Sequence, residues 1–433
     1  MATYNVVAEG ADPTGDRAID PVLDDLVERG ATLVFPDGTY RLGTLEVGSR
    51  MDDLTLVAPE GARLVPDVSG NSTAWIDVRG DEFVLDGFEL DVRDVAVPPY
   101  VRMRTNAADW ELRRLVTRGN VRAATDTGVG SGDSGDARSY FVLSSADGSR
   151  GLLQDCYFHE GSCAQTEASN RRAVLVETSK GDIVFNRCWF ESWGENTVYA
   201  KKPAGQVRLY SCFFRNTNNG IRVGGNTELR NCVSVKNAQH PRAAWSNGSI
   251  QRGVVSEATD PPDRSSGVDS YDGTLLIEDC DFVHRYDGNS SRPPIAAPKP
   301  CQRIDVRDTR VSYNSSRAAD AVYTEHGEMI DGTPANLEFL QLEDLHVEND
   351  AEYAHAVSIG QVPDEWGSVS GVIGGTGHQT DSEYVESRMT TDGDPDEPDT
   401  TPPLPEPPSM GSVPLQTAQL ARIDNTEGES RST

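Results

Sequence analysis

Carboxylate, aromatic and cationic side chains recur beside short apolar segments in the middle and C-terminal half of the chain. Two carboxylates in one groove can cleave a glycosidic bond by acid/base catalysis, aromatic rings stack on sugars, and Arg or Lys binds carboxylates or sulfates. The exposed aromatic residues could equally make subunit contacts, and among 69 acidic residues a single carboxylate is weak evidence of catalysis. The candidate catalytic residues are Asp269, Glu325 and Glu177, and the candidate substrate-binding residues are Tyr199, Lys201, Lys202, Arg222, Trp245, Tyr271, Tyr323 and His326.

Motifs that would identify a particular cofactor are absent from the sequence. No HExxH segment or other close set of metal ligands occurs. The segment GVGSGDSG at 128–135 resembles a phosphate-binding loop, but no P-loop lysine follows it. A calcium-assisted lyase needs Asp or Glu ligands and an Arg or Lys base on one face, and the scattered acidic residues assign no such set. We therefore expect no required cofactor or metal, with Ca²⁺ as the open alternative.

Five of the seven cysteines lie in one repeated phrase, which indicates how the candidate residues are positioned. With Cys as position zero, apolar or small residues recur at minus five, minus three, zero and plus two, as in Ile183, Phe185, Cys188 and Phe190. The pattern also recurs without Cys, and its weakest copy is centred on Gly253. The ten copies have position zero at 88, 115, 156, 188, 212, 232, 253, 280, 309 and 345.

The spacing within each copy predicts two short strands joined by a corner. The step from minus three to zero is odd, so one straight strand cannot point both apolar pairs inward. The residue before position zero is often Asp, Asn or Ser, which tolerate left-handed backbone; examples are Asp155, Ser211, Asn231 and Asp279. Third strands are expected at 173–176, 196–200, 219–223, 266–270, 321–324 and 355–359.

Three strands per repeat, with a minimum period near twenty residues, predict an all-β fold, a parallel β-helix solenoid. A β-sandwich of short strands is the alternative, but it would not explain a constant phrase followed by a variable loop. The five cysteines then form an inward column of reduced, buried thiols, which Phe88, Leu115, Thr309 and Leu345 continue in other coils. The pairing of Cys163 and Cys301 stays open.

The composition is strongly acidic. Asp and Glu number 69 against 39 Lys and Arg, the net charge is -30, and only five of the cations are Lys. A surface that is acidic and avoids Lys is typical of proteins from extreme halophiles, where concentrated salt screens the self-repulsion. An ordinary acidic protein is the alternative. Either interpretation disfavours a nucleic-acid partner.

Three motifs follow one another near the N-terminus: GADPTGD at 10–16, an expected helix from Pro21 to Arg29, and FPDGTY at 35–40. Asp20 is the expected N-cap of the helix and Gly30 its stop. This succession resembles the N-terminal segment of the pectate-lyase-like family of right-handed parallel β-helix proteins. With the repeats, the resemblance covers residues 1 to about 375. It implies a right-handed parallel β-helix whose first coil is covered by the helix.

For function the resemblance implies a glycan along the outer face of one parallel sheet, between the loops 118–139, 285–300 and 312–338. The catalytic signatures of the enzymes are not matched: no Asn-Thr-Asp segment of polygalacturonases occurs, and the Gly-His pair at 377–378 stands alone. Because the family includes lyases, hydrolases, epimerases and virus tailspikes, the resemblance indicates the fold rather than one activity.

The expected domains are an N-terminal cap at 1–45, a parallel β-helix of about ten or more coils at 46–380, an acidic Pro-rich linker at 381–410 and a C-terminal tail at 411–433. The linker sequence is too polar to bury a core of its own. The tail has a weak helical pattern and is either a peptide that docks on a larger particle or a frayed end.

Two functional classes follow. The first is a glycan-recognising shaft of a halophilic system, a virion surface or tailspike-like host-attachment protein or a cell-surface adhesin; the resemblance to tailspikes implies a homotrimer. The second is a polysaccharide lyase or glycoside hydrolase. Both would have a surface polysaccharide as partner, and we favour the first because the catalytic motifs are absent.

The expected location is a virion or cell surface, with the cytoplasm as the alternative. The N-terminal residues contain no basic segment followed by an apolar one, so no signal peptide is recognised. No apolar run approaches the length of a transmembrane helix, so no membrane insertion is expected.

Overall fold

The structure of the protein is a computed structural model. It describes residues 2–48, 51–68, 74–95, 98–119, 139–162, 172–176, 179–194, 196–200, 205–237, 252–257, 273–285, 293–299, 302–314, 320–324, 329–330, 333–334, 337–360, 362–391 and 393–407.

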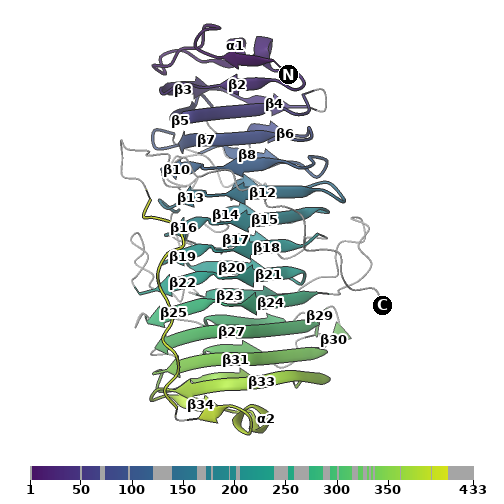
Figure 1. Ribbon diagram of the computed structural model, residues 1–433, viewed down its shortest axis with the longest axis vertical. Coiled ribbons are helices and arrows are strands. Elements are labelled where there is room, and N and C mark those ends of the chain that lie inside the picture. The colour runs from purple at the N-terminus through teal and green to yellow at the C-terminus, as the bar shows by residue number, and fades with distance from the viewer. Residues whose placement is uncertain are drawn as a thin grey trace.

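The chain forms an elongated solenoid in which each coil adds strands to two long parallel sheets (Figure 1). The fold is the right-handed parallel β-helix that the sequence predicts. In the part of the chain that the structure describes, the larger sheet has 21 strands arranged in two rows that meet at a corner, and the smaller sheet has 12 strands. The strands of these two sheets pair in parallel from one coil to the next.

The strands of the larger sheet fall into three groups. The first row contains β1 (Thr3–Asn5), β2 (Thr32–Val34), β9 (Glu111–Arg113), β12 (Arg150–Gln154), β15 (Asp182–Asn186), β18 (Val207–Tyr210), β21 (Thr227–Arg230) and β24 (Thr274–Glu278). The second row contains β3 (Thr39–Leu42), β10 (Val116–Arg118), β13 (Tyr157–Phe158), β16 (Trp189–Glu191), β19 (Phe213–Arg215), β22 (Val233–Lys236), β25 (Asp281–Arg285) and β35 (Thr390–Thr391). Five longer strands pass through both rows: β5 (Thr55–Pro66), β7 (Val84–Asp91), β27 (Arg303–Asn314), β31 (Phe339–Asn349) and β33 (Glu365–Gly374).

The smaller sheet forms the third side of each coil. Its strands are β4 (Leu45–Val47), β6 (Ala74–Val78), β8 (Tyr100–Met103), β11 (Ser139–Val142), β14 (Arg172–Leu175), β17 (Asn196–Ala200), β20 (Asn219–Val223), β23 (Arg252–Glu257), β26 (Ile295–Lys299), β28 (Val322–Thr324), β32 (His355–Ile359) and β34 (His378–Thr380). A separate antiparallel pair consists of β29 (Met329–Ile330) and β30 (Thr333–Pro334).

The corner between the two rows has the predicted left-handed backbone. Asp155, Ser211, Asn231 and Asp279 have φ values of 56°, 51°, 52° and 52°. At this corner the chain turns so that the apolar pairs on both sides of it point into the same core. The other non-Gly residues with positive φ directly before position zero are Arg114, Arg187, Asp308 and Asp344.

The predicted inward column is confirmed, with one correction. Position zero is buried in the coils of Phe88, Leu115, the five cysteines, Thr309 and Leu345. The copy at Gly253 was wrong, because β21 pairs directly with β24 and the coil of Cys280 therefore follows that of Cys232. Gly253 lies in β23 of the smaller sheet, between β20 and β26. A segment of alternating small and apolar residues can form a strand on any of the three sides of a coil. The strands that it pairs with show which side it occupies.

The predicted third strands lie in the smaller sheet. The segments 173–176, 196–200, 219–223, 321–324 and 355–359 correspond to β14, β17, β20, β28 and β32. The segment predicted at 266–270 lies outside the described residues, as do the central parts of the loops 118–139, 285–300 and 312–338.

The N-terminal end of the solenoid carries the helix α1 (Asp20–Leu26), and the opposite end carries α2 (Glu383–Glu386) (Figure 1). The predicted cap was wrong: Ile19 is the N-cap, and the Asp20 carboxylate instead accepts hydrogen bonds from the backbone N–H groups of Gly43 and Thr44. Asp20 therefore ties the start of the helix to the segment between β3 and β4. Neither described helix has the length or apolar character needed to cross a bilayer.

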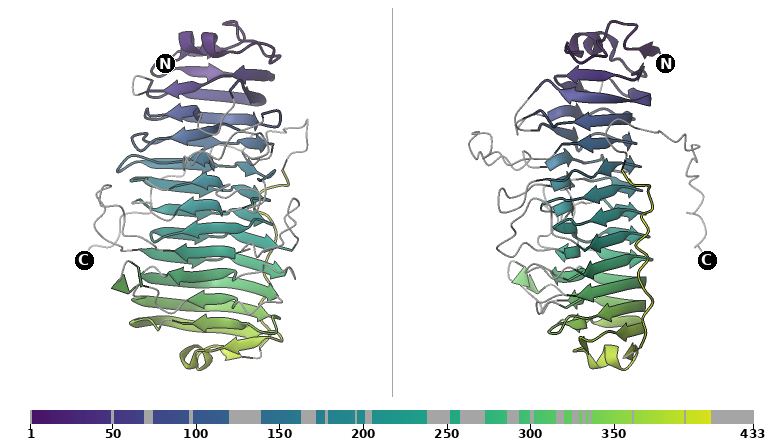
Figure 2. Two further views of the ribbon diagram at one scale, coloured as in Figure 1. Left: turned by 180° about the vertical axis from the view of Figure 1, so that it is seen from behind. Right: turned by 90° about the vertical axis from the view of Figure 1, so that its left-hand side faces the viewer.

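Residues 393–407, which we call the C-terminal strap, lie within the predicted linker. They form no regular element but run along the outside of the solenoid, from its C-terminal end toward the middle (Figures 1 and 2). The earlier part of the predicted linker contains α2 and β35, which continue the solenoid. The strap forms no core of its own, but its Leu404 packs on apolar side chains of the outer surface.

Candidate functional site

The outer face of the smaller sheet brings together two of the predicted binding residues. Tyr199 of β17 and Arg222 of β20 are register neighbours. Arg172, from β14 on the other side of β17, joins them. The guanidinium carbon of Arg172 lies 4.0 Å from the centroid of the Tyr199 ring, and that of Arg222 lies 5.3 Å from it. A tyrosine ring thus lies against two fixed positive charges through cation–π contacts.

Tyr323 shares this outer face but lies farther along the shaft. It belongs to β28, and its register neighbours are Ala296 and Ser358. Three strand spacings separate β20 from β28, which is about 14 Å. Tyr323 and Arg222 are therefore too far apart to contact one group, but they could contact one extended ligand.

The remaining predicted site residues lie outside the described residues. These are the three catalytic candidates Asp269, Glu325 and Glu177 and the binding candidates Lys201, Lys202, Trp245, Tyr271 and His326. Their roles stay predictions.

Sequence reasoning missed an arginine cluster at the N-terminal end of the same face. Asp77 of β6 is 4% exposed and accepts two hydrogen bonds from each of Arg102 and Arg104, at 2.6–3.2 Å. Arg79 lies 3.7 Å from the same carboxylate. Burial opposes ionisation of Asp77, but the hydrogen bonds from Arg104 and Arg102 outweigh it and hold the pKa at about 2. The sequence feature that could have indicated this cluster is the spacing of Arg102 and Arg104, because residues two apart on a strand lie on the same face.

Among the described residues, five guanidinium groups gather on this face, beside the carboxylates of Asp77 and its register neighbour Glu46. Three guanidinium groups surround the single carboxylate of Asp77, and two more flank Tyr199. Arg102 also lies 5.5 Å from the centroid of the Tyr100 ring. The arrangement offers planar guanidinium donors, held against tyrosine rings, for carboxylate or sulfate groups.

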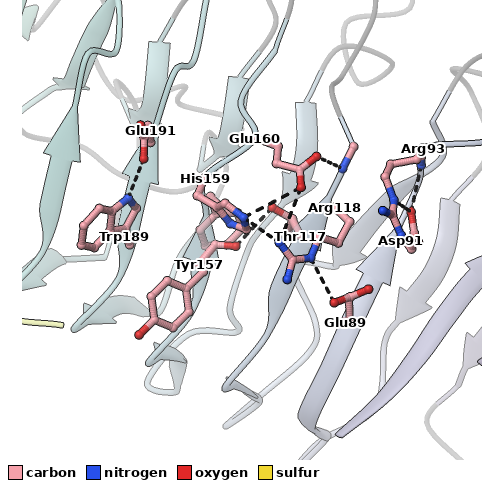
Figure 3. Close-up of polar contacts among 12 residues, drawn as sticks. Glu89, Asp91, Arg93, Thr117, Arg118, Tyr157, His159, Glu160, Trp189 and Glu191 are labelled. Carbon is pink, nitrogen blue, oxygen red and sulfur yellow. Dashed lines mark hydrogen bonds and ion pairs between the residues drawn. The ribbon is translucent and has the colours of Figure 1, made fainter. Parts of the chain in front are cut away.

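A second cluster of polar side chains lies on the outer face of the second row (Figure 3). The Arg118 side chain is only 3% exposed; its Nε lies 3.0 Å from Glu89 and its Nη1 lies 2.9 Å from Nε2 of His159. Glu160 lies 3.6 Å from Arg118 and accepts a hydrogen bond from the backbone N–H of Gly119. The charges of the cluster thus largely compensate one another.

His159 in this cluster is not suited to acid/base catalysis. Burial, together with the positive charge of Arg118, lowers the pKa of His159 to about 4, so the ring is neutral at pH 7. Because Arg118 can only donate, Nε2 must accept and the ring proton resides on Nδ1. The basic nitrogen is therefore already occupied, and the cluster fixes neighbouring coils rather than moving protons.

A groove of about 840 Å³ follows the corner that precedes the first row, beside β12, β15, β18, β21 and β24. Asp182 and Glu228 line it, and Arg208 lies 3.0 Å and 3.7 Å from these two carboxylates. A Cβ added to Gly205 would lie 2.2 Å from the carbonyl oxygen of Gly181, so backbone closes this corner. The groove suits a hydroxyl-rich ligand, but its described lining contains no aromatic ring for stacking.

Within the described part of the chain, no three His, Cys, Asp or Glu residues are arranged to hold a metal ion. The alternative of Ca²⁺ stays a prediction.

No protein-family model and no curated protein sequence matches the chain. Solved structures do match it. The surface adhesin PfbA of Streptococcus pneumoniae is 10% identical, with a TM-score of 0.45 over 91% of this chain and 92% of that one. The A-module of the Azotobacter vinelandii mannuronan C-5 epimerase AlgE4 is 10% identical, with a TM-score of 0.45 over 92% and 100%.

A third match is ORF18 of Geobacillus virus E2, which is 12% identical with a TM-score of 0.39. The match covers 81% of this chain but only 57% of the viral one. These matches have identities of 10–12% and TM-scores of 0.39–0.45, and nothing further is derived from them. The coils of this chain themselves form the right-handed parallel β-helix that the resemblance implied.

Proposed function

We propose that the chain is a glycan-recognising β-helix shaft that binds a polysaccharide along the outer face of its smaller sheet. The observation that carries this proposal is the group of Arg172, Tyr199 and Arg222 on three successive strands. The Tyr199 ring holds the two guanidinium groups in place, and these planar donors can pair with acidic substituents of a glycan.

The arrangement of the face favours an extended ligand over a small one. The arginine cluster around Asp77 lies on β6 and β8, and the Tyr199 group lies on β14, β17 and β20. The strands from β8 to β20 span four spacings, which is about 19 Å along the shaft. A polysaccharide lying parallel to the shaft would contact both groups.

The biological context we propose is host attachment in a halophilic system, at a virion surface or on a tailspike-like particle, with homotrimeric assembly. The excess of 69 acidic over 39 basic residues supports the halophilic context, because such a surface is best tolerated in concentrated salt. An arginine-rich face on such a surface would attract anionic glycans.

The proposal is tested by incubating the protein in molar salt with surface polysaccharide from a halophilic archaeon. Tyr199→Ala should weaken binding about ten-fold, because two cation–π contacts of about 0.5–1 kcal/mol each hold Arg172 and Arg222 in place and would be lost. The matched control is Tyr353→Ala, since Tyr353 is 60% exposed and precedes β32. Both variants should keep the melting temperature of the parent. Equal binding by the parent and Tyr199→Ala would contradict the proposed face.

The same incubation distinguishes recognition from catalysis. Binding without new reducing or unsaturated ends supports the attachment function. New ends would instead indicate a polysaccharide lyase or glycoside hydrolase, and the Asp269, Glu325 and Glu177 carboxylates would be replaced first.

A further inference from the structure

The C-terminal strap lies on residues that are far from it in the sequence. It leaves the solenoid at Gly393, whose N–H donates to the carbonyl of Ile373, and the backbone N–H of Asp396 donates to Nδ1 of His346 at 2.9 Å. Its other end reaches β13, β16 and β19, along the side of the shaft (Figures 1 and 2). The strap thus spans several coils without adding a strand to either sheet.

An apolar patch on the outer face of the second row contacts Leu404 of the strap. Leu404 is 4% exposed and packs with Trp189, Phe213, Val233 and Val235 in a cluster separate from the main core. The rings of Trp189 and Phe213 have centroids 4.4 Å apart. These side chains point away from the core, so a contiguous apolar patch would face water if Leu404 were absent.

Polar groups contact the two residues that follow Leu404. The hydroxyl of Tyr157 donates to the carbonyl of Pro405 at 3.3 Å. Both terminal nitrogens of Arg215 donate to the Glu406 carboxylate, at 3.1 and 3.3 Å. Arg215 is held in place by a 2.9 Å contact with Glu191 and by packing over the Trp189 ring at 4.9 Å.

Three consecutive strap residues are therefore contacted in three chemically different ways: an apolar pocket, a hydroxyl donor and a guanidinium. Pro403 and Pro407 flank these three residues, and Pro405 is one of the three. Extended proline-rich peptides bind other proteins through this combination of an aromatic-lined groove and a few polar contacts, because little chain entropy is lost. The geometry is that of a receptor with a bound peptide.

Charge also favours this peptide over others. The strap contains five carboxylates and no Lys or Arg. The surface beneath it supplies Arg215 to Glu406. Hydrogen bonds from Thr401 lower the pKa of Asp399, and the nearby positive charge of Arg310 lowers it further. Most of an acidic chain with a net charge of -30 would repel the same segment.

We propose that the outer face formed by Tyr157, Trp189, Phe213, Val233, Val235 and Arg215, here called the strap seat, is a peptide-docking site that accepts the Pro-Leu-Pro-Glu segment of a second copy of this chain. The chain's own strap is the resident occupant. Because this strap is tethered to the same chain, its effective concentration at the strap seat is about millimolar. The Pro-Leu-Pro-Glu segment of a second copy therefore binds when the resident strap is displaced. The proposal is independent of the glycan-binding face, which lies on the smaller sheet.

The first test uses a full-length chain with a displaced strap, Leu404→Asp with Glu406→Arg, in which the strap seat is unchanged. A fluorescently labelled peptide of residues 399–407 should bind this variant saturably and the parent chain at least about ten-fold more weakly, because the parent's seat is filled. The same peptide with Leu404→Asp should not bind. Circular dichroism and the melting temperature establish that the variant is folded.

The second test asks for binding between two chains. A partner with an intact strap but a disabled seat, Arg215→Ala with Phe213→Asp, is mixed with the displaced-strap chain. Sedimentation should show a one-to-one complex that neither chain forms alone. A folded displaced-strap chain that fails to bind the peptide, or equal binding by the parent, would overturn the docking site; peptide binding without a complex would overturn the second copy as its occupant.

Discussion

The cysteines of the repeated phrase stack directly on one another in five successive coils. The backbone N–H of the residue after Cys188, Cys212, Cys232 and Cys280 donates in turn to the carbonyl of the cysteine in the preceding coil. All five are buried and unpaired, as expected for an inward column. Leu115, Thr309 and Leu345 occupy the same position elsewhere. The position therefore accepts several apolar or small side chains and does not require a thiol. Cys163 and Cys301 lie outside the described residues.

Substitution of Cys212 tests this interpretation. Cys212→Val should change the free energy of unfolding by less than about 1.5 kcal/mol, because Val has a similar volume and Cys212 makes only weak S–H contacts to the carbonyls of Phe185 and Tyr210. Cys212→Asp should cost about 3 kcal/mol or more, because it buries a charge without a partner. Denaturant unfolding measures both, and equal damage would contradict the assignment.

Lys236 is a buried cation without an acidic partner among the described residues. It is 1% exposed, and its Nζ contacts Thr217 and the carbonyl of Asn218. Burial lowers the pKa of Lys236 to about 7. Its register neighbour in the next coil is His284, so a short polar seam interrupts the apolar core.

The titration of Lys236 predicts a pH dependence of stability. Between pH 7 and the ordinary lysine pKa of 10.5, the unfolded chain binds a proton that the folded chain does not, so stability rises with pH. The slope should approach about 1.4 kcal/mol per pH unit from this group alone. The difference in unfolding free energy between the parent and Lys236→Met, measured from pH 7 to 10, isolates it. A difference independent of pH would show that Lys236 is not titrating in this range.

The corner between the two rows is the element that makes the coils possible. The residue before position zero has left-handed backbone. This conformation is unfavourable for most residue types, but Gly, Asn and Asp adopt it at little cost. Asp308 has a φ of 46° and is exposed, so its side chain contributes little else. The sequence predicted the corner because residues an odd number of positions apart on one straight strand cannot both point inward. The Asp, Asn and Ser residues indicated where the corner lies.

Asp308 allows the cost of this corner to be measured. Asp308→Val should lower the free energy of unfolding by about 1–2 kcal/mol, because a β-branched residue is strained at positive φ. Asp308→Gly and Asp308→Asn should lie within about 0.5 kcal/mol of the parent, since both residue types accept this backbone. If all three variants had the same stability, the corner would not be under this constraint.

At the scale of the whole molecule, the distribution of charge separates the surfaces. Acidic residues dominate the chain, while arginine groups gather on the outer face of the smaller sheet and single cations hold the acidic strap. The net charge of -30 opposes the compact state through self-repulsion.

The melting temperature should therefore rise as NaCl is increased from about 0.1 M to about 1 M, over which the Debye length falls from about 10 Å to about 3 Å. Differential scanning calorimetry measures the rise. Sucrose, which strengthens burial without screening charge, is the control and should produce a smaller rise. A melting temperature that stays constant or falls in NaCl would contradict the halophilic interpretation of the composition.

The sequence by itself determined the solenoid, its inward column and its corners, because these depend on local periodicity and on backbone preferences that each coil repeats. It also selected Tyr199 and Arg222 as outward residues, since side chains alternate along a strand. The tertiary structure alone decided which strands are neighbours. It placed Gly253 in the smaller sheet, brought Arg172 to Tyr199, and gathered Arg102 and Arg104 around Asp77. It also placed the strap against the shaft, with Leu404 packed on Trp189. These two residues are far apart along the chain, and a local sequence pattern does not indicate a contact between distant segments.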